Sequence, residues 1–276
     1  MKSLTFFSFI ILLCACQPPK PPEIKYTVTG HGEKTLFFVH GWCINGSYWD
    51  SQVAAFQDRY RVVTVDLAGH GASKVTREDW SFDRYAQDVV NVIQYLDLKN
   101  VILIGHSMSG SIITRVSLTM PDRVIALIGI DNFNDVAAPL DSVQESQIAQ
   151  LIEVLKTNYR ETAVAISSAS LFSPTTDSSV IKRVLNDIEN ADPATSASTI
   201  ESVTGESKVE GAILKKLKLP LWLINSDRNS VNEEALKEYC PKSYKIKWVS
   251  GTGHYPMIEN PEEFNARLDE FLSELH

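Results

Sequence analysis

Short runs of apolar residues recur along the chain, and most of them end at a glycine or a polar residue. They occupy residues 35–39, 62–65, 101–104, 124–130, 221–224 and 244–249. Runs of this length that are rich in β-branched residues are typical of strands buried on both faces, as in a parallel sheet covered by helices. Between two of the runs, apolar residues at Tyr85, Val89, Ile93 and Leu96 predict a helix over 82–96. The alternation of strands and helices predicts a doubly wound α/β sheet.

One connection between predicted strands is too long to be a loop. Connections in α/β units usually have about 2–6 residues, whereas residues 134–218 contain no convincing strand. Helical periodicity over 144–155, 161–171 and 180–190 predicts a small helical cap in this segment. The Ser- and Thr-rich stretch 194–204 is expected to form only helix ends and loops.

The N-terminal residues differ in composition from the rest of the chain. Lys2 is followed by an apolar run over 4–13 and then by Ala15 and Cys16. This pattern is typical of a secretory signal, because a bilayer span would need about twenty apolar residues. The tetrapeptide 13–16 resembles the lipobox of bacterial lipoproteins, in which the chain is cut before the last Cys. The resemblance implies a lipid on Cys16 that anchors the protein to a membrane surface.

The expected organisation follows from these segments. Residues 1–15 form a signal peptide, 16–25 a lipid-anchored, proline-rich spacer, 26–133 and 219–276 the α/β core, and 134–218 the cap. The expected location is the bacterial cell envelope, as a lipoprotein. A soluble periplasmic or secreted protein is the alternative, if cleavage occurs nearby without lipidation.

Composition and charge narrow the possible partners. The 276 residues are 44% hydrophobic and 22% charged, which excludes a disordered or multi-span membrane protein. A net charge of -8 argues against nucleic acid as a partner, because a phosphate-binding surface needs the opposite sign. Cys43 and Cys240 are expected to be unpaired, although export permits a disulfide. No His/Cys spacing indicates a metal site, and no cofactor is expected.

A candidate nucleophile follows the predicted strand 101–104 directly. The segment 105–110 reads Gly-His-Ser-Met-Ser-Gly, close to the Gly-x-Ser-x-Gly pattern of a nucleophile elbow, which needs a tight turn from strand to helix. Ser109 occupies the place of the second glycine, and Gly110 comes one residue later. The motif is common by chance, so its position after a buried strand is what makes Ser107 a candidate nucleophile.

A serine hydroxyl needs a base to act as a nucleophile at neutral pH. His254 lies in a glycine-containing loop between the last predicted strand and the last helix, where catalytic residues of such sheets are found. His106 adjoins the candidate nucleophile but is expected to be packed away from it. His254 is therefore the expected base.

An acid that orients the imidazole completes the constellation. Asp227 follows the predicted strand 221–224 and gives the chain order Ser, Asp, His, which is the order expected for an elbow on such a sheet. Asp131, at the end of the predicted strand 124–130, is the alternative. Asp227 is the expected acid, and Asp131 remains open.

A family resemblance lies in four segments: His40-Gly41-Trp42, the glycine-containing stretch 66–73, the candidate elbow 105–110 and the stretch 253–264 that contains His254. In these segments the chain resembles the cap-bearing branch of the α/β-hydrolase superfamily. The matching motifs extend over residues 36 to 264. The resemblance implies that Ser107 is the nucleophile and His254 the base, and that the backbone N–H groups of Trp42 and Met108 form the oxyanion hole. The usual glycine spacing before the acid is blurred, which leaves its identity in doubt.

The resemblance also implies a reaction. We expect a serine hydrolase that cleaves a small carboxylic ester, lactone or thioester through an acyl-enzyme, with a small molecule as substrate. A Ser nucleophile argues against haloalkane dehalogenases and epoxide hydrolases of this fold, which use Asp. A carbon–carbon hydrolase or perhydrolase with the same triad, and a low-turnover binding protein of the same fold, are the alternatives.

Overall fold

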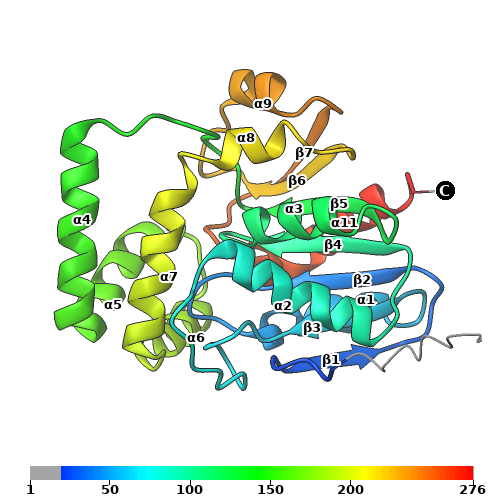
Figure 1. Ribbon diagram of the computed structural model, residues 1–276, viewed down its shortest axis with the longest axis horizontal. Helices are drawn as coiled ribbons and strands as arrows, with labels where there is room; N and C mark the ends of the chain where they lie inside the picture. The colour runs from blue at the N-terminus through cyan, green and yellow to red at the C-terminus, as the bar shows by residue number, and fades with distance from the viewer. Residues whose placement is uncertain (1–19, 276) are drawn as a thin grey trace, which may run out of the picture.

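The computed structural model describes residues 20–275, so the expected signal peptide and Cys16 lie outside the described residues. Within them, seven strands form one sheet in the order β1-β3-β2-β4-β5-β6-β7 (Figure 1). The strands are β1 Tyr26–Thr29, β2 Thr35–Val39, β3 Arg61–Val65, β4 Val101–His106, β5 Val124–Ile130, β6 Leu221–Ser226 and β7 Tyr244–Val249. β1 pairs with β3 antiparallel, and the other pairs are parallel. The predicted mostly parallel sheet is confirmed.

Strand β1 is the strand that the apolar pattern did not predict. Its residues, Tyr-Thr-Val-Thr, lie at the edge of the sheet, and two of the four are exposed. Because an edge strand is covered on few sides, it does not need a continuous apolar run.

Helices cover both faces of this sheet. The core helices are α1 Asp50–Phe56, α2 Phe82–Tyr95, α3 Ser109–Thr119, α9 Glu233–Tyr239, α10 Pro256–Glu259 and α11 Pro261–Leu272, with a 3₁₀ turn, η1, at Gly46–Trp49. Side chains of α2 and α3 pack into one apolar cluster, and those of α1 and α11 pack into a second cluster on the opposite face. Figure 1 shows α2 and α3 in front of the central strands.

Strand β4 shows why the sheet needs both layers. All six of its residues are buried. Val101 and Leu103 point into one cluster, whereas Ile102 and Ile104 point into the other, as the two-residue period of a strand requires. The strand that leads to Ser107 is therefore fixed by packing on both faces.

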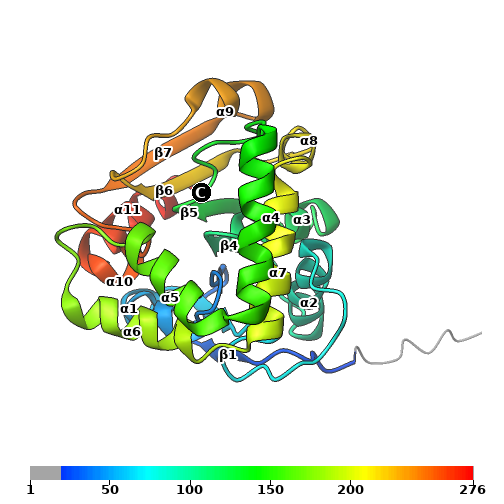
Figure 2. The ribbon, with the colours of Figure 1, turned by 90° about the vertical axis from the view of Figure 1, so that its left-hand side faces the viewer.

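The segment between β5 and β6 is helical, as predicted. It contains α4 Ser142–Thr157, α5 Tyr159–Ser170, α6 Ser178–Glu189, α7 Pro193–Glu206 and α8 Glu210–Leu214. Figures 1 and 2 show α4 to α7 gathered beyond one end of the sheet. We call α4 to α7 the cap. No helix within residues 20–275 is long and apolar enough to cross a bilayer.

Helix α7 corrects the expectation for residues 194–204, which are helical rather than loop. Its start carries two helix signals, because Pro193 occupies the first turn and the Asp192 side chain accepts a hydrogen bond from Thr195 N at 2.8 Å. Its small polar residues Ser196 and Thr199 are buried against the core. Ser and Thr are weak helix formers, so tertiary contacts stabilise this helix.

Glu210 begins α8, where the chain returns from the cap to the sheet. It is partly buried, and burial raises its pKa to about 7, an effect that the nearby Glu206 increases. The hydrogen bond that it accepts from Ala137 N is long, at 3.4 Å. The nearby Arg115 forms a bidentate ion pair with Glu206 and not with Glu210. Glu210 is therefore a carboxyl group that folding makes harder to ionise.

The raised pKa predicts a pH-dependent stability. Between pH 4.5, the ordinary value for Glu, and about 7, the folded protein binds a proton at Glu210 that the unfolded chain has released, so the free energy of unfolding falls as pH rises through this window. Glu210→Gln should remove this loss and stabilise the protein by up to about 3 kcal/mol above pH 7. Urea unfolding at pH 5, 6, 7.5 and 8.5 measures the difference.

The matched control is Glu238→Gln, which removes a carboxylate from the exposed end of α9. It should change stability by less than about 0.5 kcal/mol at every pH. A pH slope in Glu210→Gln equal to that of the wild type would contradict the assignment.

Candidate active site

Ser107 lies at the tight turn between β4 and α3, as the sequence predicted. Its backbone has a φ of 54°, in the left-handed region that residues with a Cβ seldom adopt. The turn is held by the hydrogen bond from Ser107 N to Ile130 O, at 2.9 Å. A Cβ added to Gly105 would lie 2.5 Å from the backbone oxygen of Ser109, which explains the glycine two residues before the serine. The strained turn exposes Ser107 at the end of the strand.

The departure at Ser109 has a structural explanation. Ser109 is fully buried, and its hydroxyl donates to His40 O at 2.5 Å. The serine in place of glycine therefore links the nucleophile helix to the loop that contains Trp42. The small residue that the turn requires is Gly110 instead, because a Cβ there would lie only 2.4 Å from the Asn132 side-chain nitrogen.

Asn132 supports the elbow and was missed from the sequence. Its Nδ2 donates to Gly105 O at 2.9 Å and to Ser107 O at 3.2 Å. No local pattern marks it, because an asparagine after a strand resembles any turn residue. Only the pairing of β4 with β5 brings it under the turn.

The structure pairs His254 with Asp131. His254 Nδ1 and Asp131 Oδ2 are 2.5 Å apart, and the other oxygen of Asp131 accepts from Ser226 N at 3.0 Å. Burial alone would raise the pKa of Asp131, but the hydrogen bond and charge of His254 outweigh it and hold that pKa below its ordinary value. Asp131 is thus a buried carboxylate that fixes the orientation of the imidazole through Nδ1.

The expectation for Asp227 is corrected. Asp227 is exposed, and its side chain accepts a hydrogen bond from Gly251 N at 2.9 Å rather than from the imidazole. The physical reason is the place in the sheet of the strand that precedes each aspartate. Asp131 follows the central strand β5, with a φ of 45°, and reaches across the end of β6, whereas Asp227 turns outward after β6 and supports the loop before His254.

Three other histidines are buried and structural. His106 Nε2 donates to the backbone oxygen of His254 at 2.7 Å, and burial lowers its pKa to about 3. Burial also lowers the pKa of His70 to about 4 and that of His40 well below its ordinary value. The expectation that His106 is packed is confirmed, and its contact places the His254 loop next to the elbow.

The loop that carries Trp42 passes over the elbow. A Cβ on Gly41 would lie 3.1 Å from Ser107 Cβ and 2.6 Å from His106 Nδ1, so only glycine permits this approach. Among residues 20–275, neither Trp42 N nor Met108 N donates a hydrogen bond to a protein acceptor. Met108 N also lies at the start of α3, where the helix dipole favours negative charge.

A cavity of about 290 Å³ opens at Ser107. Its walls include Met108, Phe133, Glu206 and Glu210, so the space beside the candidate nucleophile is partly apolar and partly acidic. A volume of this size suits a small ligand or one arm of a larger one.

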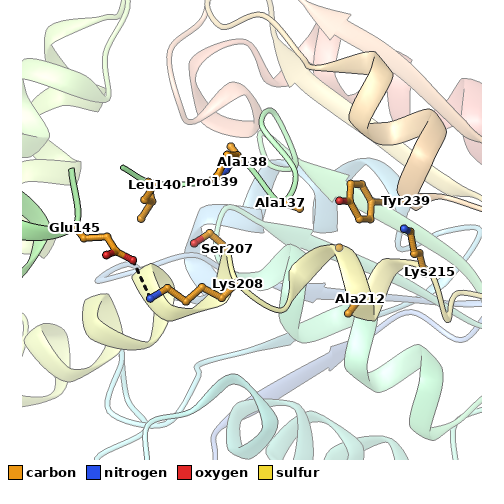
Figure 3. A pocket seen from close by; sticks show the side chains of 11 residues that line it. Ala137, Ala138, Pro139, Leu140, Glu145, Ser207, Lys208, Ala212, Lys215 and Tyr239 are labelled. Atoms are coloured by element: carbon orange, nitrogen blue, oxygen red, sulfur yellow. Dashed lines mark ion pairs between the residues drawn. The ribbon is translucent and has the colours of Figure 1, made fainter. Parts of the chain in front are cut away.

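A second cavity, of about 500 Å³, lies at the base of the cap between the segment 137–140, α8 and α9 (Figure 3). Lys208 and Glu145 form an ion pair of 2.9 Å on its wall, and Lys215 lies 4.4 Å from the centre of the Tyr239 ring. Neither Ser107 nor His254 lines it, whereas Ser107 and Asp131 both line the cavity of about 290 Å³.

The described residues contain no group of three or more His, Cys, Asp or Glu side chains placed to hold a metal ion. Cys43 and Cys240 are buried and unpaired. Burial raises the pKa of the Cys43 thiol to about 12 and that of Cys240 to about 11, so both stay protonated at neutral pH and are poor nucleophiles.

Comparison with known proteins agrees with this fold. Residues 36–267 match the model of the alpha/beta hydrolase family. A non-heme chloroperoxidase of Burkholderia pyrrocinia is 41% identical over 95 residues, 34% of either chain. A pimeloyl-[acyl-carrier protein] methyl ester esterase of Nitrosomonas europaea is 24% identical over 90% of this chain and 98% of its own. The structure of a hydrolase from Oleispira antarctica superposes with a TM-score of 0.81 at 20% identity, over 91% of this chain and 95% of that one.

The local match to the chloroperoxidase spans about a third of that protein, and the superposition at 20% identity is evidence for the fold alone. The family match covers most of the chain, from the second strand to the last helix. The chain therefore belongs to the alpha/beta hydrolase family, and it is an enzyme of that class.

Proposed function

We propose that the protein is a serine hydrolase that cleaves a small carboxylic ester, lactone or thioester. The observation that carries the proposal is the contact of Asp131 with His254 Nδ1. His106, the residue before Ser107 in the strained elbow, joins the elbow to the His254 loop through its hydrogen bond to His254 O. The esterase that is similar over 90% of the chain supports an ester as the substrate. The cavity at Ser107 has a volume of about 290 Å³, and this size supports a small or slender substrate.

The proposed reaction has two halves. His254 Nε2 takes the proton of the Ser107 hydroxyl as the oxygen attacks the carbonyl carbon, and the N–H groups of Trp42 and Met108 bind the oxyanion. The imidazolium, stabilised by Asp131, then protonates the leaving alcohol, and an acyl-enzyme remains. In the second half, His254 removes a proton from water as the water oxygen attacks the acyl carbon. The imidazolium then gives this proton to Ser107 Oγ as the bond from that oxygen to the acyl carbon breaks, which releases the acid and the free serine.

The nucleophile is tested by covalent labelling. A fluorophosphonate probe should label the wild-type protein at one site, and Ser107→Ala should lose both the label and at least about 10³-fold in hydrolysis of p-nitrophenyl butyrate. Mass spectrometry and absorbance report the two results. Ser117→Ala, which removes a buried hydroxyl from the helix that follows Ser107, is the matched control and should keep both.

Two outcomes would change the proposal. If the wild-type protein resists the probe and cleaves no short-chain ester, the esterase function is dropped. If Ser107 is labelled but no ester, lactone or thioester is cleaved, a carbon–carbon hydrolase, a perhydrolase or a low-turnover binding protein takes its place.

The acid is tested by comparing two substitutions. Asp131→Asn places an amide against His254 Nδ1, stabilises the wrong tautomer and should lower kcat by about 10³–10⁴. Asp227→Asn keeps a carbonyl oxygen for Gly251 N and should stay within about threefold of the wild type. Steady-state kinetics with one ester decide, and a larger loss in Asp227→Asn would contradict the assignment.

We also propose that the mature protein is a lipoprotein of the bacterial cell envelope, anchored through Cys16. Its support is the apolar run 4–13 before Leu13-Cys14-Ala15-Cys16 and the proline-rich spacer after it. A lipid on Cys16 would tether the folded body to a membrane surface.

Lipidation is tested in bacteria that express the full chain. Cys16→Ser should abolish metabolic labelling with radioactive palmitate and move the protein from the membrane fraction to the soluble fraction. Cys14→Ser is the matched control and should keep both, since serine is common at that lipobox position. Loss of the label in Cys14→Ser alone would contradict Cys16 as the site.

A further inference from the structure

The loop His40 to Cys43 is held from the core side at its first residues. The His40 carbonyl accepts from Ser109 Oγ at 2.5 Å, and the His40 ring accepts from Leu67 N at 2.9 Å and donates to Gly41 O at 2.7 Å. Because His40 is fully buried, this half of the loop has no freedom to move independently of the sheet.

The second half of the same loop is held by the cap. Trp42 Nε1 donates to the backbone oxygen of Ser196 in α7 at 3.0 Å. The Cys43 sulfur lies 3.2 Å from Ser196 Oγ and 3.2 Å from the Tyr159 hydroxyl of α5. Tyr159 in turn donates to Ile188 O at 2.9 Å. We call the contacts among Trp42, Cys43, Tyr159 and Ser196 the cap clamp.

Cys43 is in an unfavourable backbone conformation that the cap clamp supports. Its φ is 59°, a region that costs free energy for any residue with a Cβ and persists only where surrounding contacts hold it. The sulfur of this residue donates to Ser196 Oγ and lies 3.2 Å from the Tyr159 hydroxyl, so two cap side chains hold it. The orientation of the peptide groups on either side of Trp42 therefore depends on the cap as well as on the core.

The cap also touches the loop of the proposed base. His254 N donates to Leu171 O, just after α5, at 2.7 Å. The cap thus contacts the loops that carry two separate parts of the proposed machinery, the oxyanion donor and the base.

We propose that Ser196 and Tyr159 are positioning residues, which set the Trp42 N–H in place for the oxyanion by clamping its loop to the cap. The inference rests on the proposed serine-hydrolase function. A cap in contact with the core completes the oxyanion hole, whereas loss of the cap clamp leaves a site that binds substrate but stabilises the transition state poorly. The cap is then a part of the catalytic geometry and not only a cover for the substrate.

The test compares two buried tyrosines that each join cap and core through a hydroxyl. The Tyr159 hydroxyl lies 3.2 Å from Cys43 Sγ in the oxyanion loop. The Tyr85 hydroxyl of α2 lies 2.9 Å from Thr199 Oγ1 of α7 and makes no hydrogen bond to that loop within the described residues. Tyr159→Phe, Ser196→Ala and the double variant should lower kcat by about 10- to 100-fold, since loss of one oxyanion donor costs about 10²–10³, with KM within about twofold. Tyr85→Phe should leave kcat unchanged.

Two further measurements separate positioning from a loss of stability. The affinity for a boronic acid that mimics the tetrahedral intermediate should fall in parallel with kcat/KM in the Tyr159 and Ser196 variants. Amide hydrogen exchange in the peptide over residues 40–46 should speed up in these variants and not in Tyr85→Phe.

The inference is overturned if the double variant keeps the wild-type kcat, or if Tyr85→Phe loses as much as Tyr159→Phe. If the wild-type protein cleaves nothing and resists the fluorophosphonate, the proposed function fails. In that case hydrogen exchange alone still decides whether the cap fixes the loop, and unchanged exchange would reject the cap clamp.

Discussion

The lateral pairing of β4 with β5 is the constraint on which the site depends. The register sets His106 beside Ile130, and the bond from Ser107 N to Ile130 O continues the pairing by one residue. Ser107 and Asp131 therefore leave the same edge of the sheet from neighbouring strands. Because β4 and β5 are buried throughout nearly their whole length, neither residue can shift without disturbing the core.

Burial separates the structural histidines of this protein from the proposed base. His40, His70 and His106 are inside, where loss of solvation keeps them neutral, and each uses a ring nitrogen to hold a backbone group. Among the histidines of residues 20–275, His254 is the one with a buried carboxylate on Nδ1 and partial exposure of its side chain. The difference between a structural imidazole and a proposed base is thus the partner on one nitrogen and the access to the other.

The cap is joined to the core by polar contacts as well as by apolar packing. Arg115 of α3 donates two hydrogen bonds to the carboxylate of Glu206 in α7. The Tyr48 hydroxyl donates to the carboxylate of Asp187 in α6 at 2.8 Å. Polar contacts of this kind are directional, so they define the position of the cap on the core more precisely than apolar packing does. That property suits a cap whose position bears on the geometry of the oxyanion loop.

Local patterns determined the six strands β2 to β7 but not β1, and they determined the helical insertion and the positions of Ser107 and His254 after strands. These features depend on apolar periodicity and on turn residues, which act over a few neighbouring positions. Only the tertiary structure decided that Asp131 and not Asp227 meets His254, because both follow strands that end at the same edge and only lateral order and backbone direction distinguish them. The same holds for α7, whose serines and threonines form a helix because the core covers them, and for the contact of Ser196 with a loop far away in the sequence. Such pairings depend on the packing of the whole chain, so no short stretch of residues contains them.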